Sequence, residues 1–550
     1  MLNNSILPRV AYFCMEYGLH EELPIYSGGL GILAGDHIKC AGEKKLPFAA
    51  VGILWKQGYT TQLIDEHGRP YDVFTDINVD FLKDTGIKVK VEIENHDVWC
   101  KVWLLDKYGN APLYLLDTDL PENNEKRYIT RRLYCGSIHE RIAQEIVLGV
   151  GGVRALRALG KEVDVYHFNE GHAILGAIEM IREKMNNGLS FEEAWEKTRK
   201  EVVFTTHTPV SAGNGSYCHK DMSQVGAYNG FSYEQMSRLG GDPFSLTVAG
   251  LRLSRKANGV SKTHSQTAQK MWEHVENSST ILDITNGVHR NTWQDHRIRE
   301  AFEKGEDLWP PHQEAKKELI DEIYKRIQVK LDPNALTIGF ARRVTSYKRC
   351  DLIFRNAHEL DPLLKSGTVQ LIFSGKVHPQ DEEGKSLVPL IIDMCRKYPH
   401  SIVFLENYDM KLGKILTRGC DVWLNTPRRP LEASGTSGMK AAMNGVLNKS
   451  ILDGWWPEAC QHGVNGWQIG DGYEGCNQDE HDLNSLLHVL KSEVIPTYYN
   501  KRSCWLEMMK SSIASSVEQF SAERMLREYY TRMYYLDESL EKTAAVQSKG

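Results

Sequence analysis

Short apolar segments that end in glycine or polar residues recur along this chain and alternate with stretches long enough for helices. In the second half these segments span residues 335–343, 368–376, 401–407 and 420–427. The first half contains similar segments at residues 163–169 and 201–208. The alternation predicts parallel strands joined by helical crossovers, and in such sheets ligand-binding groups gather at the carboxyl ends of the strands.

The length of the chain predicts more than one domain. With 550 residues it exceeds the size at which a single hydrophobic core keeps growing. A proline-broken connection followed by a charged helix predicts a boundary near residue 290. We therefore expect an α/β protein with two doubly wound domains, at residues 1–290 and 291–515. Helical spacing of apolar residues over 516–540 predicts a long C-terminal helix, so residues 516–550 would pack back on the body and end in a frayed tail.

Charge and cysteine content exclude several classes of partner and site. The net charge of -6 and the pI near 6.4 leave no excess of basic residues for nucleic acid or an acidic membrane surface. The sequence shows neither a secretion signal nor a spanning segment, so we expect a cytoplasmic protein without a membrane partner. The 11 cysteines are scattered without a CxxC pair, which indicates reduced thiols and predicts neither a disulfide framework nor a metal site.

A lysine surrounded by small residues marks the stretch EASGTSGMKAAMNG at residues 432–445. Its hydroxyls and glycines precede a predicted helix whose N-terminus suits a phosphate group, with Lys440 one turn further on. A partly desolvated lysine beside that anion could form a Schiff base with an aldehyde cofactor, although a lysine on a helix is by default a solvated side chain. The residues alone leave both interpretations open.

Two further clusters are candidate anion sites. Gly28 and Gly29 precede a predicted helix, where their N–H groups either bind an anion or simply form a tight turn. The basic residues of RRVTSYKR at 342–349 crowd the end of a predicted strand, and an anion among them would offset their mutual repulsion. A solvated turn paired with nearby acids is the alternative. The position at the ligand edge of the sheet favours phosphate binding.

A series of motifs runs through most of the chain. The motifs are SGGLG at 27–31, NEGH at 169–172, THT at 206–208, ANGVSKTHS at 257–265, TNGV at 285–288, RRVTSYKR at 342–349, FLENY at 404–408 and EASGTSGMKAAMNG at 432–445. In this order they resemble the glycogen, starch and maltodextrin phosphorylases, and the short bacterial and archaeal enzymes of that family in particular. The resemblance implies a GT-B glycosyltransferase fold, in which two Rossmann-like domains face a cleft, and pyridoxal 5'-phosphate bound covalently to Lys440. It also implies retaining phosphorolysis of α-1,4-glucans at their non-reducing ends by inorganic phosphate, with the cofactor phosphate as proton relay and α-D-glucose 1-phosphate as product.

The resemblance assigns roles to individual residues. For the reacting phosphate it implies Arg343 and Lys348, helped by the N–H groups of Gly28 and Gly29. For the cofactor it implies Lys440 as anchor, Arg342, Thr436 and Ser437 around the phosphate group, and Trp293 beside it. For the transferred glucose it implies His207 and Asn286 at the 6-hydroxyl, Tyr347, Glu432, Ser434 and Gly435 at the other hydroxyls, and His172 at the edge of the cleft.

The chain departs from the long phosphorylases of this family. Where they carry an arginine after ENY this chain has Asp409, so we expect Asp409 not to bind the cofactor, and Arg428 and Arg429 are the nearest candidates to replace that arginine. The segment that aligns with their gate loop, at residues 133–145, is shorter. The chain also begins close to the first motif, so we expect it to lack their N-terminal phosphorylation and nucleotide-effector region. Relatives are commonly homodimers, and a homodimer is possible here.

Two other functions fit parts of the same pattern. A nucleotide-sugar-dependent glucosyltransferase shares the two-domain fold and a basic pair, but it would not need Lys440. A catalytically silent glucan-binding protein could be built on the same fold, because fold alone does not fix function.

Overall fold

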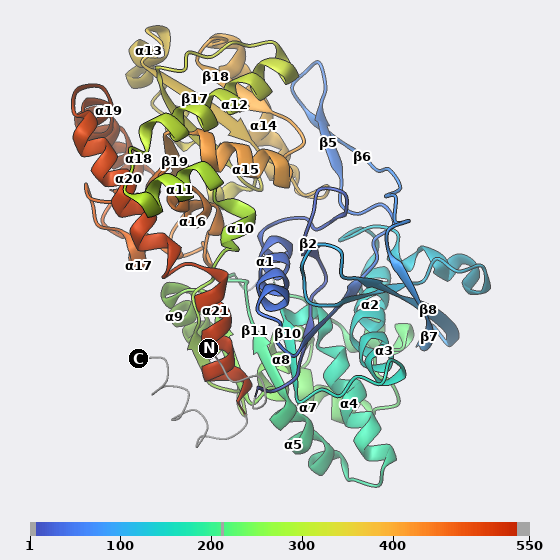
Figure 1. The fold of residues 1–550 in the computed structure, drawn as a ribbon. Coiled ribbons are helices and arrows are strands. Elements are labelled where there is room, and N and C mark those ends of the chain that lie inside the picture. Colours follow the sequence, from blue (N-terminus) through green and yellow to red (C-terminus); the bar gives the residue numbers. More distant parts are fainter. Residues whose placement is uncertain (1–6, 211–213, 536–550) are drawn as a thin grey trace. The chain divides into compact units, whose positions relative to one another are not determined.

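The structure of the chain is a computed structural model that describes residues 7–210 and 214–535. The chain forms two compact units, coloured along the sequence in Figure 1. Unit 1 comprises Met1–Tyr59, Phe74–Thr285 and Ala522–Gly550, and unit 2 comprises Thr60–Val73 and Asn286–Ser521. Each unit contains one large, mainly parallel sheet covered by helices, which confirms the predicted α/β class with two doubly wound domains.

The sheet of unit 1 has the strand order β15-β14-β11-β10-β1-β4-β9-β8-β7. Its parallel strands are β1 (Val10–Phe13), β4 (Phe48–Ile53), β9 (Leu113–Asp117), β10 (Val165–Asn169), β11 (Val202–Thr205), β14 (Lys256–Gly259) and β15 (Ile281–Asp283). Every residue of the central strand β1 is buried, as expected for a strand that is covered on both faces. At one end of the sheet, the edge strand β7 (Lys83–Ile93) and its neighbour β8 (His96–Leu105) are antiparallel and alternate between exposed and buried side chains, so one of their faces meets solvent.

The helices of unit 1 begin where the sequence places capping residues. Ser190 accepts a hydrogen bond from the N–H of Glu193 and the Glu193 carboxylate accepts one from the N–H of Ser190, which fixes the start of α5. Ser137 and Glu140 form the same capping box at α2. The remaining helix bounds are α1 (Gly29–Glu43), α2 (Ile138–Ile146), α3 (Gly152–Ala158), α4 (Leu175–Asn186), α5 (Phe191–Glu201), α6 (His219–Val225), α7 (Tyr233–Gly240), α8 (Leu246–Leu253) and α9 (Lys262–Met271).

The sheet of unit 2 is parallel throughout, in the order β18-β17-β16-β19-β20-β21. The strands are β16 (Leu336–Ala341), β17 (Val369–Ser374), β18 (Ile402–Leu405), β19 (Val422–Asn425), β20 (Leu447–Ile451) and β21 (Gly466–Ile469). The first four lie inside the apolar segments from which they were predicted. Because β16 and β19 are neighbours, the loops at their carboxyl ends leave the sheet side by side.

Helices cover this second sheet, and Figure 1 shows α12 and α15 lying side by side. Their bounds are α10 (Arg290–Trp293), α11 (His296–Lys304), α12 (Trp309–Ile327), α13 (Ala357–Lys365), α14 (Glu382–Lys397), α15 (Met410–Gly419), α16 (Thr436–Met443), α17 (Trp456–Ala459), α18 (Gln478–Val489), α19 (Ile495–Asn500) and α20 (Arg502–Val517). A hairpin of β5 (Thr61–Ile64) and β6 (Pro70–Val73) also belongs to unit 2, although it is far from the rest of that unit in sequence. Gln62 exchanges hydrogen bonds of 3.1 Å and 2.8 Å with the backbone of Val377 and so ties the hairpin to the end of β17.

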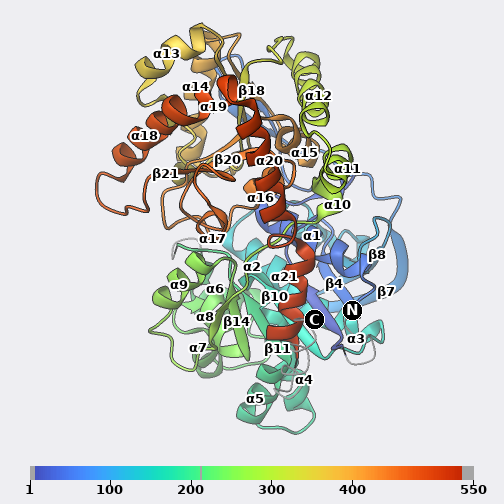
Figure 2. The same cartoon turned by 60° about the vertical axis from the view of Figure 1, so that its left-hand side comes forward.

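The long helix expected over residues 516–540 is divided in the structure. Helix α20 ends at Val517, and α21 (Ala522–Glu528) starts where the chain passes from unit 2 to unit 1, followed by a wide turn at Tyr529–Tyr534. Figure 2 shows α21 beside the strands of unit 1, and its apolar side chains join the core of that unit. The tail predicted to fray lies outside the described residues. None of the helices formed by residues 7–210 and 214–535 is both long and apolar enough to cross a bilayer.

Candidate active site

Most of the predicted site residues belong to unit 2, where they lie on two loops and two helices. The loop after β16 carries Arg342, Arg343, Tyr347 and Lys348, and the loop after β19 carries Glu432, Ser434 and Gly435. Helix α16 carries Thr436, Ser437 and Lys440, α10 ends at Trp293, and Asn286 begins the unit. Unit 1 carries Gly28, Gly29, His172 and His207. The two groups are described separately below.

Lys440 lies under an aromatic ring. Its side chain is 7% exposed, and its Nζ is 3.8 Å from the centroid of the Trp293 ring, within the range of a cation–π contact. Asn444 fixes this arrangement, because its Nδ2 donates to the carbonyl oxygens of Lys440 at 2.8 Å and Trp293 at 3.1 Å. The N–H of Asp295 in turn donates to Asn444 Oδ1 at 2.7 Å. Lys440 is therefore a desolvated amine in a fixed place rather than a solvated helix residue.

The glycines of the lysine motif have separate structural causes. Gly435 has a φ of +85°, a left-handed conformation that favours glycine, and it turns the chain into α16. A Cβ at Gly438 would lie 2.6 Å from Asn448 Oδ1 and 2.9 Å from Trp455 Nε1, so only glycine fits there. Since Gly435 also has no side chain with which to cap α16, the first N–H groups of this helix remain suited to an anion.

Two cations and one carboxylate form the centre of the unit 2 site. Glu432 accepts a hydrogen bond from Lys348 Nζ and pairs with Arg342 Nη1 at 3.4 Å, and all three side chains are buried. Arg342 Nη2 also lies 3.4 Å from Ser437 Oγ, which accepts a hydrogen bond of 3.1 Å from Trp423 Nε1. The cluster thus joins the loop after β16 to the start of α16.

The charges of this cluster shift the ionisation of its members. Burial opposes ionisation of Glu432, but the charges of Lys348, Arg342 and the exposed Arg343 hold the pKa of its carboxyl below the usual value. Burial lowers the pKa of Arg342, and Glu432 opposes that shift. Arg342 and Lys348 therefore share one carboxylate, and the resulting excess of positive charge suits an anionic ligand.

Two buried polar atoms of the cluster point to a ligand. Within the described part of the chain, Arg342 Nε and Ser434 Oγ have no hydrogen-bond partner, although a buried polar group without a partner is costly. Together with the uncapped start of α16 and the desolvated Lys440, they fit a group that brings a phosphate and an aldehyde. These residues therefore fit pyridoxal phosphate on the grounds of their own chemistry.

The sequence analysis missed several residues around this centre. Tyr408 lies near Arg342, whose charge opposes the rise in the tyrosine pKa caused by burial, and its hydroxyl approaches Gly413 together with the Trp293 ring. Asp453 accepts hydrogen bonds of 2.8 Å from the N–H groups of Glu432 and Gly454. It follows β20 at the same edge of the sheet, and this position was the signal that could have identified it.

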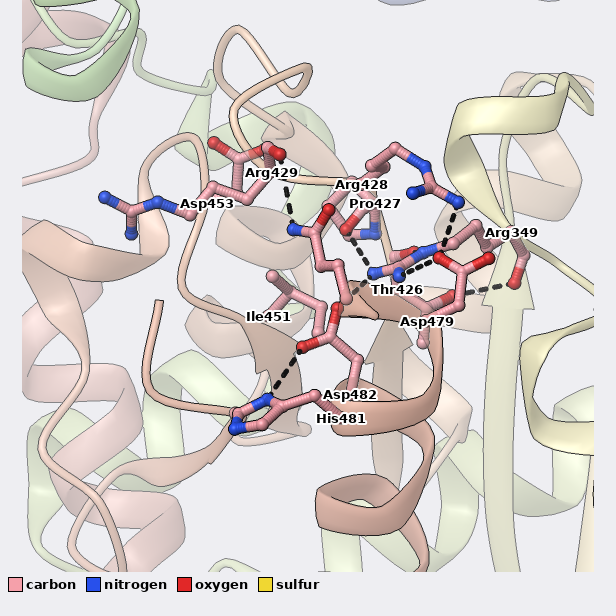
Figure 3. Close-up of polar contacts among 12 residues, drawn as sticks. Arg349, Thr426, Pro427, Arg428, Arg429, Ile451, Asp453, Asp479, His481 and Asp482 are labelled. Carbon is pink, nitrogen blue, oxygen red and sulfur yellow. Dashed lines mark hydrogen bonds and ion pairs between the residues drawn. The ribbon is translucent and has the colours of Figure 1, made fainter. Parts of the chain in front are cut away.

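Asp409 has a structural task of its own. Its carboxylate accepts a hydrogen bond of 2.8 Å from the N–H of Leu412 and caps α15. The two arginines considered as replacements for the family arginine are bound elsewhere, as Figure 3 shows for their surroundings. Arg428 pairs with Asp479 at 2.5 Å, and Arg429 pairs with Glu474 at 2.7 Å and donates to the carbonyl of Leu452. Neither interaction directs these guanidinium groups toward Lys440.

In unit 1, the predicted histidine His207 is held as a neutral ring. Burial lowers its pKa to about 3, and its Nε2 lies 2.6 Å from Oδ1 of the buried Asn169. Asn169 Oδ1 can only accept, so Nε2 carries the proton and Nδ1 is left as an acceptor. Glu170 supports the same segment in a left-handed backbone conformation with φ +74°, and its Oε2 accepts from the N–H of His207 at 2.8 Å.

The other predicted residues of unit 1 lie in two places. His172 has its pKa lowered to about 4 by burial and lies beside Tyr134, with 5.6 Å between the ring centroids. The N–H of Gly28 donates to Glu16 Oε2 at 3.2 Å, so an anion at this turn competes with that carboxylate. No atoms lie within 4 Å of where a Cβ would stand on Gly28 or Gly29, and the turn is therefore open on that side within the described chain.

Comparisons with known proteins identify the family of this chain. The family model described as carbohydrate phosphorylase matches residues 295–461, which include the loop after β16 and helix α16 with Lys440 but not α10. The maltodextrin phosphorylase of Thermococcus litoralis is 40% identical over 96% of this chain and 70% of its own length. The glycogen phosphorylase of Mycobacterium tuberculosis is 36% identical over 98% of this chain and 72% of its own length, and that of Aquifex aeolicus is 35% identical over 96% and 86%. The chain therefore belongs to the carbohydrate phosphorylase family.

Proposed function

We propose that this chain is an α-glucan phosphorylase that transfers the glucosyl group at the non-reducing end of an α-1,4-glucan to inorganic phosphate, with retention, and releases α-D-glucose 1-phosphate. The observation that carries the proposal is the pairing of a desolvated Lys440 with a cluster in which cations outnumber carboxylates. A nucleotide-sugar-dependent transferase would need the cations but not that lysine. The composition supports a cytoplasmic enzyme without a nucleic-acid or membrane partner, and a homodimer stays a proposal.

Charge balance explains how two phosphate groups could share the site. Arg342 and Lys348 carry two positive charges, and the carboxylate of Glu432, with which both pair, offsets only one of them. Two phosphate groups held close together would repel each other strongly without such an excess. Lys348 would turn from Glu432 to the substrate phosphate together with Arg343, which would free the carboxylate of Glu432 to accept a sugar hydroxyl.

The cofactor would be held by the residues around α16. Lys440 would bind it covalently, Trp293 would pack on it, and Arg342, Thr436 and Ser437 would hold its phosphate at the start of the helix. When bound, pyridoxal phosphate supplies a phosphate group that can exchange a proton with the substrate phosphate. The protein would then need no carboxylic acid of its own to protonate the leaving oxygen.

The remaining predicted residues would orient the sugar. Nδ1 of His207 would accept a hydrogen bond from the 6-hydroxyl, since Nε2–H is engaged by Asn169, and Asn286 would share that hydroxyl. Tyr347, Glu432, Ser434 and Gly435 would meet the other hydroxyls, and His172 would line the edge of the site. The N–H groups of Gly28 and Gly29 would reach the substrate phosphate only after Glu16 releases Gly28.

Reduction with borohydride tests the cofactor and its anchor together. We expect the purified protein to absorb as a pyridoxal protein, and after reduction a pyridoxyl label on Lys440 in a peptide map. Lys449 is the matched rival, because it is a buried lysine of the same unit whose pKa burial lowers to about 7. A label on Lys449, or no label after addition of pyridoxal phosphate, would contradict the proposal that Lys440 binds the cofactor covalently.

Product analysis tests the reaction. With maltoheptaose and inorganic phosphate we expect release of α-D-glucose 1-phosphate. With maltoheptaose and UDP-glucose, without phosphate, we expect no release of UDP. Transfer from UDP-glucose would favour the nucleotide-sugar enzyme. Binding of the glucan without turnover by cofactor-loaded protein would favour a silent glucan-binding protein.

A further inference from the structure

We infer that Arg349 is a positioning residue, which latches together the two loops of the unit 2 site and thereby holds Lys348 in place for phosphate. The first loop is residues 342–349, after β16, and the second is residues 426–435, after β19. The inference rests on the proposed function of Lys348 as a ligand of the substrate phosphate. No role was predicted for Arg349 itself beyond membership of the basic cluster.

Figure 3 shows the side chain of Arg349, from the first loop, beside Thr426 and Pro427 of the second loop. Its side chain is only 1% exposed. Nε donates to the carbonyl of Thr426 at 2.9 Å, and Nη2 donates to the carbonyl of Pro427 at 2.7 Å. The backbone of Arg349 is in a left-handed conformation with φ +48°, which is uncommon for a residue other than glycine and which persists only where the surroundings impose it.

Hydrogen bonds in the opposite direction complete the latch. Thr426 Oγ1 lies 3.1 Å from the carbonyl oxygen of Lys348 and 3.0 Å from that of Arg349, and it donates to this pair. The N–H of Arg428 donates to the carbonyl of Tyr347 at 2.7 Å. Each loop therefore donates to the backbone of the other, and the carbonyl of Lys348 is one of the groups that is held.

Two carboxylates from α18 neutralise the buried positive charge of Arg349. Arg349 Nη1 pairs with Asp479 at 2.8 Å, and Nη2 pairs with Asp482 at 2.7 Å. A buried cation is stable only when it is paired and its donors are satisfied, and here Nε, Nη1 and Nη2 all have acceptors. A lysine could neutralise the carboxylates, but a single ammonium cannot span acceptors that are arranged around a planar fork.

The position of the latch connects it first to Lys348 and phosphate, although Tyr347, Glu432, Ser434 and Gly435, which would meet the sugar, lie on the same two loops. Lys348 precedes Arg349 directly, and its amine contacts Glu432 on the second loop. Movement of one loop against the other would displace Lys348 relative to Glu432 and the start of α16, and misplacement of a binding group by about 1 Å can cost on the order of 100-fold in rate. The residues that would meet the 6-hydroxyl, His207 and Asn286, are not part of the latch.

The test compares the use of phosphate and glucan by Arg349→Lys in the cofactor-loaded enzyme. We expect the KM for inorganic phosphate to rise at least tenfold and the KM for maltoheptaose to rise by a clearly smaller factor, because the sugar is also held by residues outside the two loops. Titration calorimetry with inorganic phosphate should show the same loss of affinity without turnover. Arg355→Gln is the matched control, because Arg355 also pairs with Asp479, at 2.5 Å, but is 39% exposed and bonds to neither loop. Its KM for phosphate should stay within twofold of the wild type.

A second variant keeps the test decisive if Arg349→Lys folds poorly. Thr426→Val removes the hydroxyl that bonds to the carbonyls of Lys348 and Arg349 without changing charge. We expect a rise of at least threefold in the KM for phosphate and a smaller rise in the KM for maltoheptaose. Equal rises in both KM values, or unchanged phosphate affinity in a less stable protein, would show that the network is merely structural and overturn the inference. Failure of the proposed function has a different signature, since the wild-type enzyme would then release no glucose 1-phosphate.

Discussion

Asp453 differs from an ordinary aspartate in its ionisation. Burial raises the pKa of its carboxyl to about 7, and the charge of Glu432 adds to the shift, while hydrogen bonds from the backbone N–H groups of Glu432 and Gly454 oppose it. In the unfolded chain the same carboxyl has a pKa near 3.9. Between these two pH values the folded protein holds a proton that the unfolded chain has released, so the free energy of unfolding falls as the pH rises.

We therefore predict that Asp453→Asn gains stability relative to the wild type from pH 5 to pH 8. The asparagine cannot ionise, so the difference in free energy of unfolding should move in its favour by roughly 2–3 kcal/mol over that range. Urea unfolding at each pH measures the difference. Asp393→Asn, at a carboxyl of unit 2 that is 68% exposed, serves as the control. A difference that stays constant with pH would contradict a buried proton on Asp453.

Asn169 allows a prediction at the sugar side of the reaction. Its Oδ1 accepts a hydrogen bond from the Nε2–H of His207 and so leaves Nδ1 as the acceptor that is available to the sugar. Asn169→Leu keeps the bulk and removes the acceptor, and the loss of one such hydrogen bond costs roughly 0.5–1.5 kcal/mol, or roughly 2–10-fold. We expect kcat/KM for maltoheptaose to fall by that factor while the KM for phosphate stays constant. If Asn169→Leu instead lost affinity for phosphate, the placement of His207 at the 6-hydroxyl of the sugar would be contradicted.

The sequence pointed to the residues whose chemistry is tied to local motifs. Lys440, the basic loop and the small residues before α16 could be identified because each lies within a short contiguous stretch. Tyr408 and Asn444 lie in the same motifs and Asp453 follows a strand, but their roles could not be assigned, because these roles arise from strands and helices that meet only in the folded unit. A tyrosine or an aspartate after a strand is common, and only the contact with Arg342 or Glu432 distinguishes these two.

At the scale of elements, the capping of α15 explains why an aspartate stands after FLENY. Asp409 satisfies the N–H of Leu412, and loss of such an N-cap typically costs about 1 kcal/mol. We predict that Asp409→Ala lowers the free energy of unfolding by about that amount, whereas Asp409→Asn, which can also cap, changes it little. Chemical denaturation measures both. The affinity of the apoprotein for pyridoxal phosphate, measured by fluorescence, should be the same in Asp409→Asn as in the wild type, and a marked change would make Asp409 part of the cofactor site.

Strands could be predicted from the sequence where the residues they bury form one contiguous apolar run. Strands β16 to β19 of unit 2 are apolar runs that end in polar residues, and the structure places a parallel strand in each. The antiparallel pair β7 and β8 gave no such signal, because alternating exposed and buried positions look like ordinary surface in isolation. The division between α20 and α21 is equally invisible, since it depends on where the chain leaves one unit for the other.

At the scale of the whole molecule, the α/β class of GT-B type was predictable from the sequence, but the course of the chain through the two units was not. Hairpin β5–β6 belongs to unit 2 through contacts of Gln62 and Ile64 with residues more than 300 positions away. Residues 522–535 return to unit 1 in the same way. Such contacts depend on the pairing of distant surfaces, for which apolar periodicity gives no partner.

Residues 522–535, which return to unit 1, contribute much of the buried apolar surface of that unit. The side chains of Met525, Leu526, Tyr529, Tyr530, Met533 and Tyr534 are each at most 2% exposed in the core of unit 1. Burial of one large apolar side chain contributes roughly 1.5–3 kcal/mol, so together they rival the roughly 5–15 kcal/mol that stabilises a typical domain. Removal of this segment would also leave buried His167 without its hydrogen bond of 2.7 Å to the Tyr534 hydroxyl.

We therefore predict that a chain ending at Ser521 unfolds in unit 1 while unit 2 stays folded. Hydrogen exchange resolved by peptide should show loss of protection in β10 and β11 of unit 1, whose His167 and Thr205 bond to Tyr534 and Tyr529 of the missing segment, and retained protection in β16 and β17 of unit 2. Unit 2 is thus the internal control, since the cut removes none of its residues. Tyr534→Phe, which removes only the hydroxyl, should lower stability by roughly 1–3 kcal/mol without unfolding the unit. Equal loss of protection in both units would mean that they unfold together, and full protection in unit 1 would mean that its core does not depend on the returning segment.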